Sequence, residues 1–327
     1  MELTTPWRIL YGDRSSVSGH LAIDRLEFSE VVIENQLIGL ADQESTSFMD
    51  DAVDGVFGLG FPANSAFHLD KSQHNLQETL GGGAQGDAAL NTTVLGSIMK
   101  HAILPTPIFS VWLGGGGGDK GWGNNSIQTP EATNPPSTDG KNTHGENVSS
   151  YHDELVDGEY LFGSIDTSRF EGNLTYAPIV RPNFWQVKVD GITLDHGRLD
   201  LHLHGEAIID TGTTLLVFPT VHAKAINTAL GAVSDPWEGW IVPCDHQQPN
   251  EQQGSLDFQI GGASFSVRRL DLVREPASTR PGYCYSAVIP SPAANTIILG
   301  DIFIRNNYCV FDLERLAIGF APLAKII

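Results

Sequence analysis

The sequence predicts a mainly β protein, and three observations point to that class. Short apolar segments recur along most of the 327 residues, separated by turns that draw on 35 glycines and 18 prolines. Only two or three helices are predicted, without the strand–helix–strand alternation of a parallel sheet. Hydrophobic residues make up 41% of the chain, enough to bury a core and to exclude wholesale disorder. The length suggests two domains or one large all-β unit.

The first predicted element is a hairpin in a pair of strands within residues 7–40. Residues 7–11 form the first strand, and residues 20–28 alternate apolar and polar side chains with one slip of phase. The polar residues 12–19 between them predict an eight-residue tip. Residues 53–61 form an apolar segment with three glycines, which predicts a short strand where the backbone approaches a neighbour closely.

A helix is predicted next, over residues 92–103. Thr92 or Thr93 can cap it, Pro105 ends it, and its apolar face consists of Val94, Leu95, Ile98 and Met99. Residues 81–86 and 114–150 contain too little apolar surface to offset chain entropy and are predicted to be disordered.

Strands return at short spacing in the second half of the chain. They are predicted at residues 160–165, 174–179, 185–189, 207–209, 255–260, 264–267, 296–299 and 308–312. A second helix is predicted over residues 219–230, with Pro219 in its first turn and Gly231 closing it.

The net charge of −20 excludes several classes of partner. Such a chain repels phosphate backbones and anionic lipid, so neither nucleic-acid binding nor membrane-surface binding is expected. It would suit a protein that works and stays soluble at low pH. No apolar run approaches the ~18 residues of a membrane span, and the N-terminus lacks the basic and apolar regions of a signal peptide.

Cysteines and sequons give weaker signals. Three cysteines allow one disulfide and leave one thiol, with Cys309 interpreted as a buried small hydrophobe because it lies in an apolar strand. Four glycosylation sequons favour the secretory route, in conflict with the missing signal peptide. The sequons begin at Asn91, Asn124, Asn147 and Asn173. His202 and His204 alternate, so an exposed strand face is favoured over a metal site, which needs a third ligand.

One motif carries recognisable chemistry. Residues 207–216 place Asp210 directly after an apolar strand and before a Thr-Gly-Thr-Thr segment. Gly212 lets the chain turn tightly, so backbone N–H groups can approach the Asp210 oxygens, and the threonine hydroxyls can orient the carboxylate. A buried turn whose aspartate only caps the backbone has the same pattern, so this motif alone leaves both interpretations open.

Six further segments, in order along the chain, resemble the pepsin-like aspartic endopeptidases. They are the hairpin around Tyr11, Gly12 and Asp13, residues 54–60, residues 163–178, residues 184–186, residues 297–305, and residues 308–322. The resemblance implies a bilobal pepsin-like acid protease fold, with 1–178 as a remnant of the N-terminal lobe and 179–327 as the C-terminal lobe. It also implies a disulfide between Cys244 and Cys284.

The resemblance implies water-mediated hydrolysis of peptide bonds at acid pH. In this family two aspartates hold one water and share one proton, because neighbouring carboxyls do not both ionise. Asp210 matches the aspartate of the second lobe. Substrate contacts are implied for the hairpin residues Tyr11, Gly12 and Asp13, which resemble a flap. They are implied as well for the floor residues Gly212, Thr213 and Thr214.

No metal or organic cofactor is implied, and peptides with bulky apolar residues beside the cleaved bond are the expected substrates. Asp301 follows the segment 297–300 that faces the Asp210 turn by resemblance. It could tune the pH response, but a cap for the helix after it is the favoured interpretation. The protein is expected to be a monomer located outside the cell or in a vacuole.

The sequence contains no second Asp-Thr-Gly or Asp-Ser-Gly motif. Asp210 precedes Gly300 by 90 residues, and the same step back from Gly58 falls upstream of Met1. We therefore expect the first lobe to be incomplete, with the first catalytic aspartate and its strands missing together. That loss should expose apolar side chains of the hairpin such as Ile9, Leu10 and Ile23.

Three interpretations follow from the single motif. The sequence could be a fragment or incomplete gene model of an active enzyme. It could be an inactive homologue that binds a peptide or a partner protein. A homodimer that pairs two copies of Asp210 fits less well, because the remnant of the first lobe would obstruct symmetric pairing.

Overall fold

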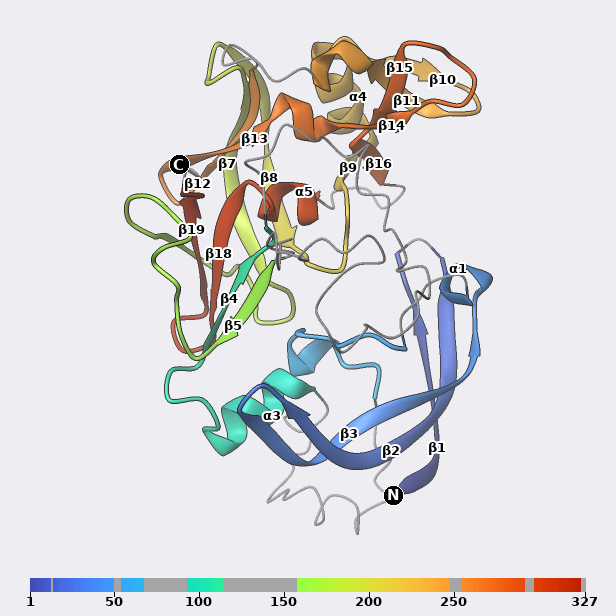
Figure 1. Ribbon diagram of the computed structural model, residues 1–327, viewed down its shortest axis with the longest axis vertical. Coiled ribbons are helices and arrows are strands. Elements are labelled where there is room, and N and C mark those ends of the chain that lie inside the picture. Colours follow the sequence, from blue (N-terminus) through green and yellow to red (C-terminus); the bar gives the residue numbers. More distant parts are fainter. Residues whose placement is uncertain are drawn as a thin grey trace, which may run out of the picture.

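Four β-sheets make up most of the described chain (Figure 1), as expected for a mainly β protein. The computed structural model describes residues 1–12, 14–49, 54–67, 93–114, 158–247, 254–291 and 297–324. Figure 1 shows two bodies, one built on the blue N-terminal sheet and the other on the remaining three sheets, which is the bilobal form of the pepsin-like fold. No helix within these ranges is long and apolar enough to cross a membrane.

The N-terminal sheet contains three strands, whereas a pair was predicted. They pair in the order β1 (Glu2–Leu10), β2 (Ser16–Phe28) and β3 (Val31–Glu44). Leu10 pairs with Ser16, so the tip spans only residues 11–15 and the predicted eight-residue tip is wrong. Strand β2 pairs with β1 on one edge and with β3 on the other, and the pairing with β3 keeps its polar first residues extended. Ile23 is only 5% exposed, against the expectation, while Leu10 is 67% exposed as expected.

The strand predicted at residues 53–61 does not form over residues 54–61, which are the ones that the structure describes. Val56 is 74% exposed, and a Cβ added at Gly55, Gly58 or Gly60 would meet nothing within 4 Å. A strand needs a hydrogen-bonded neighbour, and glycines weaken the preference for one. The segment is followed by the single turn η1 (Pro62–Asn64), and the helical turn α1 (Thr46–Met49) precedes it.

The first predicted helix is α3 (Val94–His101). The Thr93 hydroxyl accepts the N–H of Gly96 at 3.0 Å, so Thr93 is the cap. Leu95 and Ile98 are buried, but Met99 is 39% exposed, so its place on the apolar face was predicted wrongly. Four positions after Leu95, Met99 lies 40° beyond a full turn, which carries it to the edge of the apolar stripe.

A five-stranded sheet joins segments that are far apart in the sequence. Its order is β5 (Glu159–Phe162), β4 (Ile108–Trp112), β18 (Asn307–Asp312), β19 (Ala317–Pro322) and β6 (Thr175–Pro178). The Tyr308 hydroxyl of β18 donates to the Ser110 hydroxyl of β4 at 2.8 Å. The last strands of the chain therefore complete a sheet begun some two hundred residues earlier.

A seven-stranded sheet carries the Asp210 motif. Its order is β13 (Ala263–Arg268), β12 (Ser255–Ile260), β7 (Gln186–Leu194), β8 (Leu199–Ile209), β17 (Ile297–Leu299), β9 (Leu216–Pro219) and β16 (Val288–Ser291). Helix α4 (Thr220–Ala229) follows β9, with Pro219 at its N-cap rather than in its first turn. Gly231 has a φ of 75° just after the helix, as its predicted closing role requires. The helical turn α5 (Asp301–Ile304) follows β17.

A small four-stranded sheet extends the C-terminal body. Its order is β10 (Val233–Asp235), β11 (Gly239–Pro243), β15 (Tyr283–Ser286) and β14 (Val273–Pro276). The single turns η4 (Cys244–Gln247) and η5 (Arg269–Leu272) flank it. Cys244 and Cys284 form a disulfide here, as the resemblance implied, with their Cα atoms 5.2 Å apart.

Aromatic side chains of the C-terminal body pack in a continuous row that reaches residues 59–61. Phe109 of β4 stacks on Phe311 of β18 at 4.5 Å, and both contact Trp185. Trp185 in turn packs on Phe61 at 4.5 Å and donates its indole N–H to the carbonyl of Leu59. The row fixes residues 59–61 against the C-terminal body.

Removal of the disulfide is expected to destabilise the protein. Cys244 and Cys284 close a loop of 40 residues, and opening it increases the entropy of the unfolded chain. The double variant Cys244→Ala/Cys284→Ala should lose about 3 kcal/mol of unfolding free energy in urea titrations. Reductant should lower the wild-type midpoint toward that of the variant and leave the variant unchanged. Equal midpoints for the two oxidised proteins would contradict the expectation.

Candidate functional site

Asp210 lies where strand β8 ends. The strand pairs in parallel with β17, so Ile209 is opposite Leu299, and the Asp210 N–H donates to the Leu299 carbonyl at 3.1 Å. Both strands are almost wholly apolar and buried at this end, which fixes the backbone on which the carboxylate stands. Asp210 itself is half-buried.

Two donors hold the Asp210 carboxylate. The Gly212 N–H donates to Oδ1 at 2.9 Å, and the Thr213 hydroxyl donates to Oδ2 at 2.6 Å. The predicted roles of a tight glycine turn and of a threonine hydroxyl are thus confirmed as contacts. Thr214 is exposed, and the structure assigns no hydrogen bond to Asp210 from either Thr214 or Thr211. The plane of the carboxylate is therefore fixed by a backbone donor on one oxygen and a hydroxyl on the other.

The segment after β17 fits against the Asp210 loop. The N–H of Asp301 donates to the Thr213 carbonyl at 2.7 Å, and that of Ile302 donates to the Thr214 carbonyl at 3.2 Å. Gly300 makes this approach possible, because a Cβ there would lie 1.9 Å from the Thr213 oxygen. Two chain segments 90 residues apart thus form one rigid unit below the carboxylate.

Asp301 is the second carboxyl of this unit. Gly300, not Asp301, is the N-cap of α5, and Asp301 is the first helical residue, so the cap prediction was wrong. Burial and the nearby charge of Asp210 raise the pKa of the Asp301 carboxyl to about 6, against the opposing effect of Arg305. Asp301 is therefore neutral at acid pH while it is charged above pH 6.

Stability is expected to fall as Asp301 ionises. Its folded-state pKa of about 6 exceeds the ordinary value of 3.8, so the folded protein binds this proton more tightly than the unfolded chain. The contribution to stability is therefore highest below about pH 4 and is lost as the pH rises to 6. In thermal unfolding, the midpoint of the Asp301→Asn variant should fall less between pH 4 and pH 7 than that of the wild type. The exposed control Glu30→Gln should follow the wild type. Parallel pH curves for the Asp301 variant and the wild type would contradict this.

Tyr160 lies beside both carboxyls, although its sequence context gave no sign of it. Burial raises the pKa of the Tyr160 phenol, a hydrogen bond with Thr211 opposes that shift, and the charges of Asp301 and Asp210 add to it. The phenol therefore stays protonated across the acid and neutral range. Tyr160 stands on β5, whose register with β4 brings it to this end of the sheet. The pairing of β5 with β4, which are about fifty residues apart in the sequence, places Tyr160 beside the two carboxyls.

The predicted flap residues lie on a different sheet from Asp210. Tyr11 and Gly12 form the turn between β1 and β2, where the Tyr11 N–H donates to the Ser15 carbonyl at 2.9 Å. The Tyr11 ring packs against Phe48 of α1 at 5.5 Å. Asp13 lies outside the described residues. Contact of this hairpin with a substrate stays a prediction.

The structure also describes several of the other residues that the sequence singled out, namely one of the sequon asparagines, the two alternating histidines and the free cysteine. Asn173 is exposed, as an acceptor for glycosylation must be, while the other three sequon asparagines lie outside the described residues. His202 and His204 are exposed as favoured, although a φ of 54° at His202 interrupts the strand alternation. Cys309 is fully buried, and this burial raises the pKa of its thiol. It behaves as the predicted small hydrophobe.

Comparison with known proteins gives one consistent result. The sequence model of the family described as eukaryotic aspartyl protease matches residues 1–124 and 145–323. Residues 125–144, which it leaves out, fall inside the predicted insertion at 114–150.

Individual relatives align over nearly the whole chain. Rhizopuspepsin-1 of Rhizopus niveus is 30% identical over 321 residues, which are 98% of this chain and 65% of that protein. Rhizopuspepsin of Rhizopus chinensis is 30% identical over 326 residues, 98% of this chain and 64% of the relative. Gastricsin of Callithrix jacchus is 27% identical over 321 residues, 96% of this chain and 66% of the relative. The chain spans slightly less than two thirds of the length of these relatives.

Proposed function

The chain belongs to the eukaryotic aspartyl protease family, and from that premise we propose that it acts in the hydrolysis of peptide bonds at acid pH, with Asp210 as one of two catalytic carboxyls. The observation that carries the proposal is the Asp210 carboxylate fixed by the Gly212 N–H and the Thr213 hydroxyl. Each carboxylate oxygen receives only one of these two hydrogen bonds, so each can still accept a hydrogen bond from a water molecule. A carboxylate oriented in this way can take a proton from a water that attacks the peptide carbonyl.

The mechanism requires a second carboxyl as the partner of Asp210. The pair works because one carboxyl is ionised and draws a proton from water while the other is protonated and donates to the carbonyl oxygen. The resemblance assigns that partner to a second Asp-Thr-Gly loop, and the sequence has one such motif. We propose that residues 1–178 belong to the first lobe and residues 179–327 to the second, so the partner carboxyl would be supplied by the first lobe.

Substrate contacts are proposed on both sides of Asp210. Tyr11, Gly12 and Asp13 would cover a bound peptide, and Gly212, Thr213 and Thr214 would line its floor. Thr214 is exposed and Gly212 has no side chain, so both leave room for an extended backbone. Bulky apolar side chains beside the cleaved bond are the proposed preference.

The alternative is a peptide-binding or partner-binding protein without turnover. It is favoured by the single Asp-Thr-Gly motif, since one carboxyl cannot supply both the base and the acid. The peptide-binding surfaces just named would serve it equally well.

A secretory or vacuolar location is proposed for the protein. The disulfide between Cys244 and Cys284 is typical of oxidising compartments, and the exposed Asn173 can accept a glycan. The protein is proposed to act as a monomer on peptide or protein substrates.

The proposed function is tested by incubating the purified chain with an unfolded protein from pH 2 to pH 7. Cleavage with an acid optimum, abolished by an inhibitor that mimics the tetrahedral intermediate, is the expected result. Saturable binding of peptide without cleavage would favour the binding protein over the enzyme. Absence of both cleavage and binding in a folded sample would overturn the proposal.

A further inference from the structure

Trp237 is the most exposed large hydrophobic side chain of the described residues. It lies between β10 and β11, at the tip of their hairpin, with 91% of its surface accessible, compared with 76% for Val221, the next in rank. Tryptophan is usually buried for most of its area, because an exposed indole keeps a large apolar surface in water. Such a side chain at a loop tip is typical of a binding contact.

The backbone holds this indole in a fixed position. One oxygen of Asp235 accepts the N–H groups of Trp237 and Glu238 at 2.8 and 3.0 Å, and Gly239 closes the turn with a φ of 77°. Both backbone donors lower the pKa of the Asp235 carboxyl. The turn therefore keeps its hydrogen bonds further into the acid range than an ordinary aspartate would allow.

A second anchor ties the hairpin to its neighbouring strands. The Glu238 carboxylate accepts the N–H of Thr279 at 2.8 Å and the hydroxyl of Tyr285. These two donors, with the tyrosine hydroxyl contributing most, lower the pKa of Glu238. A loop tip anchored on both sides presents its tryptophan at little cost in conformational entropy, which is what makes rigid aromatic side chains effective in binding.

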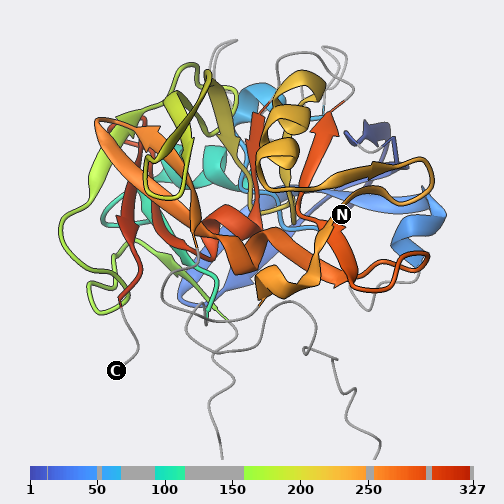
Figure 2. The same ribbon diagram turned by 90° about the horizontal axis from the view of Figure 1, so that it is seen from above.

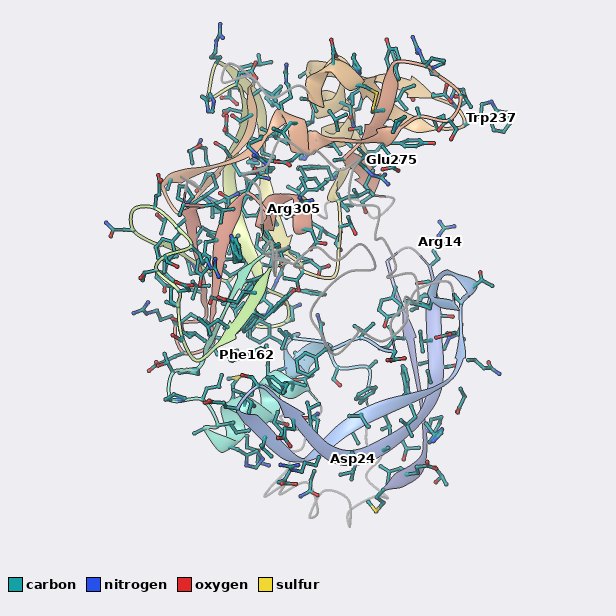
Figure 3. All side chains as sticks on the ribbon, in the orientation of Figure 1. Arg14, Asp24, Phe162, Trp237, Glu275 and Arg305 are labelled. Carbon is teal, nitrogen blue, oxygen red and sulfur yellow. A yellow bond between two sulfur atoms is a disulfide. The ribbon has the colours of Figure 1, made fainter. Side chains whose placement is uncertain are left out.

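The hairpin tip lies on the same side of the molecule as the proposed flap. In Figure 1 the β10–β11 hairpin projects above the β1–β2 hairpin, and the view from above in Figure 2 again brings the two to one side. Figure 3 places Trp237 at the end of the C-terminal body on the side where Arg14 stands at the tip of the N-terminal hairpin. Trp237 and the proposed flap therefore face the same side of the molecule, where they could contact one extended polypeptide.

We propose that Trp237 is a specificity-determining residue that binds an apolar side chain of an extended polypeptide substrate, several residues away from the cleaved bond. The inference rests on the proposed function for the direction of the substrate. The occupant is a polypeptide because an extended chain is the ligand that the Asp210 loop and the flap together would hold. The contact is apolar because the two acidic groups of the tip are already engaged by donors of the protein.

The test uses a series of peptides that grow by one residue at a time from a short cleaved core toward either end, with leucine at each added position. Trp237→Ala should leave the kinetics of the core peptide unchanged. Beyond one particular length it should raise KM by about tenfold with kcat unaltered, as expected for the loss of an aromatic anchor. Trp237→Phe should retain most of the affinity. Leu199→Ala is the matched control, since Leu199 is 48% exposed on the β7–β8 hairpin away from the flap.

A second measurement separates this inference from the proposed function. The same peptides are titrated into the Asp210→Asn protein, which cannot cleave them, with and without the Trp237→Ala change. A blue shift of tryptophan emission that begins at the same length, and is absent in the Trp237 variant, supports the inference even if the wild type proves to have no protease activity. An equal effect of Trp237→Ala at every length, or none at any length, would overturn it. So would loss of a concentration-dependent dimer in the variant without a change in peptide affinity.

Discussion

Replacement of Asp210 by asparagine is expected to lower kcat for peptide hydrolysis at least about 10³-fold. A positioned acid–base group contributes roughly 10²–10⁴ to a rate, and in the proposed mechanism the same carboxyl would also orient the water. Asparagine has nearly the same shape and can still accept the Gly212 N–H, so the loop should keep its conformation. The measurement is the rate of cleavage of an unfolded protein at acid pH, together with the thermal midpoint of each variant.

The control for this variant is Asp190→Asn. Asp190 is an exposed carboxylate on β7 that forms an ion pair with the exposed Lys188, so its loss should leave both rate and stability near the wild-type values. If the Asp210 variant retained full cleavage activity, the observed proteolysis would not depend on this site. A contaminating protease would then have to be sought.

Replacement of Gly300 by alanine is expected to have the largest effect on stability. The added Cβ would lie 1.9 Å from the Thr213 carbonyl oxygen and 2.7 Å from that of Leu215. Both are backbone atoms of the loop that leads into β9, and the Thr213 oxygen also accepts the N–H of Asp301, so relief of the clash would displace backbone and not a flexible side chain. We expect a loss of more than about 4 kcal/mol, measured by urea unfolding or seen as failure to accumulate folded protein.

Gly60→Ala is the matched control for crowding. A Cβ at Gly60 would meet nothing within 4 Å, and its φ is not in the left-handed region. This variant should stay within about 1 kcal/mol of the wild type. A Gly300 variant as stable as the Gly60 variant would mean that the two segments do not interlock as described.

The sequence predicted the Asp210 site better than its surroundings. Asp210, Gly212 and Thr213 are close in the chain, so a local motif with apolar flanks is enough to predict their contacts. Tyr160 and Asp301 reach the same place through pairing with β4 and β8, and no local pattern reports a sheet register. The propensity of Asp301 to cap a helix suggested the wrong role because Gly300 is already the cap.

Strand prediction found the three-residue β17, expected at residues 296–299, but missed other strands and placed one where none forms. β12 was predicted to the residue because its apolar pattern continues over six positions. The three- to five-residue strands around the disulfide, such as β10 and β11, are too short to show a period. Residues 54–61 show the reverse case, since an apolar segment alone does not become a strand without a partner to pair with.

The five-stranded sheet has a consequence for how the protein is made. Strand β4 emerges from the ribosome long before β18, yet its residues 108–112 are completed only by pairing with residues 307–312. The nascent chain must therefore carry an apolar, unpaired strand edge through most of translation, which is a period of aggregation risk and of dependence on chaperones. The early segments should therefore reach their final fold only after synthesis has ended. A stop codon that removes β18 and β19 would leave β4 without its pairing partner, and so would disrupt the sheet that the earlier part of the chain began.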